Sequence, residues 1–169
     1  MKKLLLPILI CFSIATFAQK SKINKGETWY HIFTGKSLEI KTDNQKNFSA
    51  QVIDGNDLVF EYGMRADENP DLTDDEYTEK ILFSVPKNAK SFMYTDTTLK
   101  AAFLRGCFCI DRGWHNVNTG FIKGKKINAT TWQVEIDVMT QPNIERNFRP
   151  IAKKFKAVFK VYKPSAKNK

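Results

Sequence analysis

The stretch T-W-Q-V-E-I-D-V-M-T, residues 131–140, carries the clearest structural signal in the chain. Its apolar residues recur at every second position, and polar residues stand between them. Because side chains in a β-strand point alternately to opposite faces, this pattern predicts a strand with one face on a core and the other in water. The apolar face consists of Trp132, Val134, Ile136 and Val138.

Similar alternation recurs on both sides of this stretch. It appears at residues 29–33, 38–40, 58–64, 79–85 and 151–162, with turn residues between the segments. About nine short strands and no series of helices between them predict a mainly β domain. We expect an antiparallel β-sandwich, because the spacing of the segments is uneven, with a lipocalin-like β-barrel as the alternative.

Two local features complete the predicted fold. Residues 48–64 have the pattern of a β-hairpin whose turn is Asp54-Gly55-Asn56-Asp57. Residues 97–105 have the pattern of one short helix, because Asp96 suits the first cap position and Gly106 the residue after the end.

The N-terminus predicts export. Residues 1–18 combine Lys2 and Lys3, an apolar run, and the small residues Thr16 and Ala18 before a cut, which is the pattern of a signal peptide. Residues 19–28 are polar and predict a flexible N-terminal arm, residues 29–163 a single β domain, and residues 164–169 a disordered tail. We therefore expect a periplasmic or extracellular protein.

Charge narrows the range of partners. The whole chain has a formal net charge of +9, and removal of residues 1–18 leaves 151 residues with a net charge of +7. The excess is mostly lysine near the C-terminus, whereas a nucleic-acid surface more often includes arginine. We expect a protein or small-ligand partner, no nucleic acid, no cofactor, and no stable membrane span in the mature chain. The C-terminal lysines are Lys153, Lys154, Lys156, Lys160, Lys163, Lys167 and Lys169.

The segment F-L-R-G-C-F-C-I-D-R-G-W-H, residues 103–115, holds both cysteines of the mature chain and one of its two histidines. As a strand it would place the two thiols beside Arg105 and Asp111 and direct Phe108 and Ile110 into the core. The Cα atoms of Cys107 and Cys109 would then be about 6.6 Å apart, which is near the upper limit for a disulfide. A bridge between them therefore requires a bulge or a kink.

Three roles for this segment are open. The cysteines are structural, bridged or packed as thiols, in the interpretation we favour. In the second they form a redox-active or chain-linking pair, and in the third they bind a metal together with His115, with Asp111 or His31 as a fourth ligand.

The acidic loop at residues 66–78 raises a calcium hypothesis, with Asp67, Asp71 and Asp75 as ligands. An EF-hand alignment fails, because Leu72 stands where glycine is needed and Thr78 where the bidentate glutamate belongs. A solvated acidic loop is the favoured interpretation.

Catalytic motifs are missing from the sequence. It contains neither G-x-S-x-G nor H-E-x-x-H. We therefore expect a small exported β domain that binds or supports something without catalysis. The alternative is an exported thiol redox or metal-handling protein that uses Cys107, Cys109 and His115.

Overall fold

The computed structural model describes residues 25–44, 47–69, 71–140 and 149–164. These residues are mainly β, as predicted, and form one mixed eight-stranded sheet. The predicted signal peptide, most of the predicted N-terminal arm and most of the predicted tail lie outside the described residues. Within them, no helix is long and apolar enough to cross a membrane. The strands are β1 (Glu27–Thr42), β2 (Phe48–Arg65), β3 (Thr78–Pro86), β4 (Ser91–Thr95), β5 (Ala101–Gly106), β6 (Gly113–Asn128), β7 (Thr131–Thr140) and β8 (Ala152–Val161).

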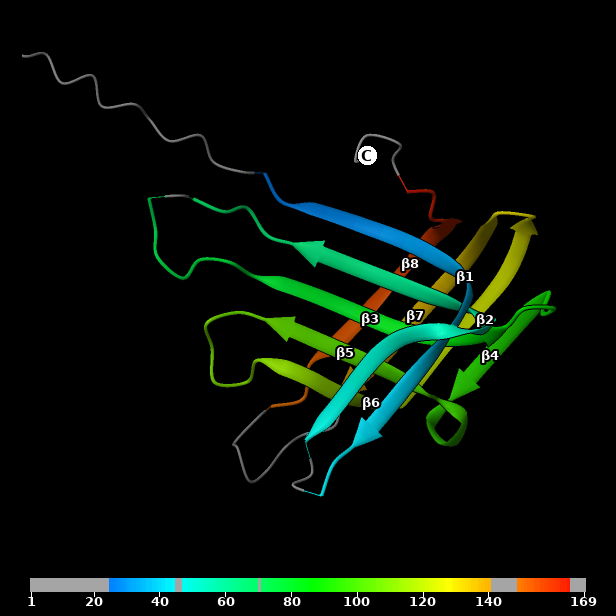
Figure 1. Cartoon of the computed structure of the whole chain (residues 1–169), viewed down its shortest axis with the longest axis horizontal. Coiled ribbons are helices and arrows are strands. Elements are labelled where there is room, and N and C mark those ends of the chain that lie inside the picture. The colour runs from blue at the N-terminus through cyan, green and yellow to red at the C-terminus, as the bar shows by residue number, and fades with distance from the viewer. Residues whose placement is uncertain (1–24, 45–46, 70, 141–148, 165–169) are drawn as a thin grey trace, which may run out of the picture.

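The strand pairings return to their starting point. The sheet runs in the order β4-β6-β5-β3-β2-β1-β8-β7, and β7 also pairs with β6, so seven strands form a ring to which β4 is attached (Figure 1). All pairings are antiparallel except the short one between β1 and β8, which is parallel. A sheet curled in this way has one interior, which fits both the sandwich and the barrel that the sequence predicted.

The interior holds an aromatic core. Trp132 is 1% exposed, as its predicted position on the core face requires, and its ring packs edge-on against Phe60 with centroids 5.6 Å apart. Phe60 stacks on Phe83, and Phe159 packs against both rings. Since these side chains come from β2, β3, β7 and β8, the core joins strands that are distant in the sequence.

The predicted hairpin at residues 48–64 is wrong. β2 continues without a break through Asp54-Gly55-Asn56-Asp57 and pairs with β1 along its whole length. A bulge occurs where Lys36 faces both Asp54 and Asp57. Gly35 has a positive φ of 67° at this bulge, a conformation that glycine adopts at low cost. The turn-forming residues therefore bend a continuous strand and do not reverse it.

The bend creates a two-stranded arm, which consists of Lys36–Thr42 from β1 and Phe48–Asp54 from β2. The arm crosses in front of β5 and β6 in Figure 1, and β2 contacts β6 although the two strands do not pair. Ala50 on the arm is buried. Val59, Leu82 and Ala102 are buried too, although their neighbours along each strand face the interior, so these three side chains point to the outer face of the sheet. The arm thus covers part of the outside of the sheet.

The predicted helix at residues 97–105 is also wrong over most of its length. Only Asp96–Thr98 is helical, as a single 3-10 turn, and Ala101–Gly106 is strand β5. Both faces of β5 are buried, because Ala101 and Phe103 face the core and Ala102 lies on the covered outer face. A strand that is apolar on both faces shows no period of two, so its apolar spacing resembled that of a helix.

Candidate functional site at the disulfide turn

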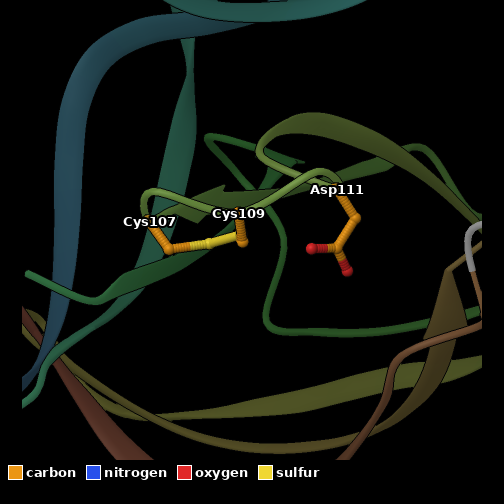
Figure 2. A group of neighbouring side chains, drawn as sticks. All are labelled: Cys107, Cys109 and Asp111. Atoms are coloured by element: carbon orange, nitrogen blue, oxygen red, sulfur yellow. A yellow bond between two sulfur atoms is a disulfide. The ribbon is translucent and has the colours of Figure 1, made fainter. Parts of the chain in front are cut away.

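The two cysteines lie on the turn that joins β5 to β6. They form a disulfide bond, with their Cα atoms 5.3 Å apart, which is within the range that such a bond requires. The strand ends at Gly106, and residues 107–111 form bends and turns. The kink that a bridge between the cysteines requires is therefore a complete change of backbone direction. Figure 2 shows the disulfide and the side chain of Asp111 on the same side of this turn.

Three further interactions hold the turn in place. The guanidinium of Arg105 forms an ion pair with the carboxylate of Asp111. Nε2 of His115 donates a hydrogen bond to the backbone carbonyl oxygen of Asp111 at 2.8 Å, and the backbone N–H of Arg112 donates to the carbonyl of Cys109 at 3.4 Å. His115 is buried on the interior face of β6 beside Phe103, so the turn is attached to the core through this imidazole.

The turn exposes two large apolar side chains. Phe108 is 73% exposed and Ile110 is 87% exposed. The prediction that both point into the core is wrong, because the strand alternation on which it relied ends at Gly106. We call residues Cys107–Arg112 the disulfide tip: its sulfur atoms and its acid lie on one side, and its two apolar side chains are exposed to solvent.

Behind the tip, the inner face of the sheet becomes charged. Glu79 is only 2% exposed and accepts a hydrogen bond from the hydroxyl of Tyr77. Its other carboxylate oxygen, Oε2, forms an ion pair with Nζ of Lys153, without the geometry of a hydrogen bond. Arg105 is the cross-strand partner of Glu79, and its guanidinium lies over the ring of Tyr77 at 5.7 Å from the centroid. We call this group the polar end of the interior.

Burial shifts the titration of side chains at the polar end and of Tyr62, a core residue on which the charge of Glu79 acts. Burial raises the pKa of Tyr62 to about 12, and the negative charge of Glu79 adds to the effect. The pKa of Tyr77 is raised, first by burial and then by its hydrogen bond to Glu79. Burial opposes the charge of Arg105, yet Tyr77 and Asp111 together raise its pKa above the ordinary value. Arg105 is therefore a cation throughout the physiological range.

The polar end was missed from the sequence, although its signal is present there. Glu79 has the same strand parity as Ile81, Phe83 and Val85, and Lys153 the same parity as Phe155 and Phe159. An acid and a base at inward positions of two strands indicate a buried pair, because neither charge is stable alone in a core.

The residues proposed as metal ligands are only partly brought together. Ligand atoms of Cys107, Cys109 and Asp111 lie within 4.8 Å of one another, but both sulfur atoms belong to the disulfide. His115 is hydrogen-bonded to the backbone carbonyl of Asp111. His31 packs against Tyr162, with the two ring centroids 4.7 Å apart. Metal binding would require reduced thiols, since the thiolate is the ligand, and it stays a prediction.

Two of the carboxylates named in the calcium hypothesis, those of Asp67 and Asp75, accept hydrogen bonds from backbone amides. Asp67 accepts from the N–H of Gly26 at 2.5 Å, and Asp75 accepts from the N–H of Asn69 at 2.6 Å. The N–H of Asp71 donates to the side chain of Asn69. These bonds fix the path of the loop, which gives Asp67 and Asp75 a structural role, and calcium binding stays untested.

The site offers a limited range of chemistry. An accessible disulfide can exchange with thiols, and exposed apolar side chains can bind an apolar surface on a partner. The charged groups behind the tip are paired with one another, which suits them to holding its shape. In comparisons with known proteins, no family model, no curated protein and no solved structure matches this chain.

Proposed function

We propose that this chain is a small exported binding protein without catalysis of its own, which docks onto another polypeptide through the disulfide tip. The observation that supports this proposal is the exposure of Phe108 and Ile110 on a turn that several interactions hold in place. Export is supported by the signal-peptide pattern of residues 1–18 and by the bridged cysteines, which persist in oxidising compartments.

The arrangement of the tip suits docking. Leu72, Met93 and Ile127 are also exposed, but each lies on a different segment, as is normal for a surface. Phe108 and Ile110 are two residues apart, so one partner surface can cover both side chains. Once covered, they would form the apolar centre of a small interface. A turn fixed beforehand loses little conformational entropy on binding, so more of the contact energy contributes to affinity.

Site-specific crosslinking tests the docking. A photoreactive amino acid is placed at position 110 or, as a control, at Ile127, which is 57% exposed and lies near the turn at the opposite end of β6. After irradiation of cells that make the protein, we expect a defined crosslinked species from position 110 and none from position 127. The crosslinked protein is then purified, and its affinity for the unlabelled chain is measured.

The affinity measurement decides the proposal. Phe108→Ser with Ile110→Ser is expected to weaken binding at least tenfold, whereas Ile127→Ser leaves it unchanged. Equal crosslinking at both positions, or binding that ignores the double substitution, would exclude the tip as the docking site. The intact mass of the exported chain tests the leader: cleavage after Ala18 is expected, and a mass that includes residues 1–18 would contradict export by this signal.

A further inference from the structure

We infer that the Cys107–Cys109 disulfide exchanges with cysteine thiols of the polypeptide that docks on the disulfide tip. This inference rests on the proposed function, because the docked chain is the thiol substrate. It adds a redox activity to a surface that would otherwise only bind. Its basis is the position of the disulfide, the surroundings of its sulfur atoms and the side chains on either side of Cys109.

The position of the disulfide limits its contribution to the stability of the fold. It joins residues two apart in the sequence and so closes a minimal loop, whereas stabilising bridges restrict long ones. The turn that it spans is also held by the Arg105–Asp111 ion pair and by His115. The protein can therefore open and close this bond while its sheet stays folded.

The surroundings of the sulfur atoms favour exchange with a bound chain. Cys107 and Cys109 are half-buried, not sealed in the core, and Phe108 and Ile110 flank Cys109 on an exposed turn. A polypeptide that covers these two side chains brings its own cysteines close to the sulfur atoms, which raises their effective concentration. A small thiol such as glutathione gains nothing comparable from the flanking side chains.

The charges beside the disulfide are balanced. A carboxylate oxygen of Asp111 lies within 4.8 Å of both sulfur atoms, and Arg105 neutralises it. The negative charge disfavours both an incoming thiolate and the thiolate that leaves, and the guanidinium offsets this effect. Arg105 and Asp111 are thus positioning residues whose charges set the rate from opposite directions.

The exchange proceeds in two balanced steps. A substrate thiolate attacks one sulfur of the pair, a new S–S bond forms, the Cys107–Cys109 bond breaks, and the other cysteine leaves as a thiolate. A second substrate thiolate then attacks the substrate sulfur of this mixed disulfide and releases the cysteine bound to it. The substrate dithiol loses two electrons and becomes a disulfide, and the pair gains them and becomes a dithiol after taking up two protons.

Exchange is measured on the oxidised mature chain with three probes. They are a synthetic peptide with two cysteines and several aromatic residues, the same peptide with serines, and reduced glutathione. Acid-quenched samples are alkylated and analysed by intact mass. We expect a mixed disulfide with the cysteine peptide, its conversion to peptide disulfide, and a rate per thiol at least about tenfold above that of glutathione. Cys107→Ser with Cys109→Ser abolishes both reactions.

Matched variants identify the source of that preference. Phe108→Ser with Ile110→Ser is expected to lower the peptide rate to that of glutathione without changing the glutathione rate, and Ile127→Ser changes neither. Asp111→Asn should accelerate glutathione exchange about fourfold, which is the effect of one unit charge at 4.8 Å in a water-like dielectric, and Arg105→Gln should slow it. Rates that move in the same direction in these two variants would overturn the role assigned to the charges.

The serine peptide separates failure of the exchange from failure of the docking. If it binds the tip but the cysteine peptide forms no mixed disulfide, the docking stands and the exchange is wrong. If the cysteine peptide reacts no faster than glutathione, the tip does not guide exchange and the inference is overturned. If the serine peptide does not bind and its cysteine counterpart still reacts faster in a manner that depends on Phe108 and Ile110, the exchange stands without stable docking.

Discussion

The two ends of the interior differ in what they contain, although strands β3 and β8 contribute to both. Around Trp132 and Phe60 the inner face is aromatic and apolar, whereas around Glu79 and Lys153 it holds paired charges and the hydroxyl of Tyr77. An apolar interior stabilises a fold through the hydrophobic effect alone. In a buried ion pair, by contrast, the attraction between the charges scarcely exceeds the free energy needed to remove both from water. The comparison suggests that the apolar end specifies the fold and that the polar end holds the disulfide tip in position.

The largest effect should come from the apolar end. Trp132→Ala removes a side chain that is 1% exposed and packed against Phe60 and Phe92, so we expect a loss of about 3 to 5 kcal/mol in the free energy of unfolding. Denaturant unfolding measures it, and Ile127→Ala, at an exposed position, serves as the control with a change near zero. A small loss for Trp132→Ala would mean that the aromatic end does not dominate stability.

The polar end should be nearly as sensitive, but for a different reason. Lys153→Met leaves the carboxylate of Glu79 buried without its cation, at an expected cost of about 3 kcal/mol. Lys154→Met is the matched control, since that lysine pairs with Asp137 on the surface, and its cost should stay below about 1 kcal/mol.

A double-mutant cycle sharpens this result. Adding Glu79→Gln to Lys153→Met removes the uncompensated charge and should restore most of the lost stability. If the second substitution adds to the loss, Lys153 stabilises the sheet through its cation over the ring of Phe103, where its Nζ lies 5.9 Å from the centroid, and not through its ion pair with Glu79.

These contrasts mark what the sequence could and could not predict. The alternation at residues 132–138 and 155–161 correctly identified strands that face a core. It failed at β5, where both faces are buried, and at Asp54–Asp57, where turn residues bend a strand whose partner, Lys36, lies 18 to 21 residues earlier. Both errors arise because tertiary contacts of the two-stranded arm determine the structure there, and the local sequence pattern does not reveal such contacts.

The same distinction applies to the site. The sequence identified the segment of Cys107 and Cys109, because reactive residues stand out by type. It placed Phe108 and Ile110 in the core, since the end of a strand depends on where its neighbours end. It also overlooked Glu79 and Lys153, which come together only through the parity of two strands 74 residues apart in the chain.

The titration of Tyr62, whose pKa is raised by burial and by the charge of Glu79, gives a test that removes no large side chain. Because the pKa of Tyr62 is raised to about 12, the unfolded chain releases this proton before the folded chain does. The stability contribution is therefore complete below pH 10 and falls as the pH rises toward 12, by at most about 3 kcal/mol. Tyr62→Phe should flatten this part of the stability profile relative to the parent chain. An unchanged slope would show that Tyr62 ionises as freely in the folded protein as in the unfolded one.

The smallest effect is expected at the disulfide itself, because neither end of the interior depends on it. For a loop this short, the chain-entropy relation gives a loss of about 1 to 2 kcal/mol for Cys107→Ser with Cys109→Ser. Dithiothreitol should shift the denaturant midpoint of the parent chain by the same amount and leave the double variant unchanged, while the far-ultraviolet spectrum of both stays that of a β protein. A loss as large as that of Trp132→Ala would mean that the bridge holds the polar end together, because the Arg105–Asp111 pair and the His115 hydrogen bond would then be unable to keep the turn in place.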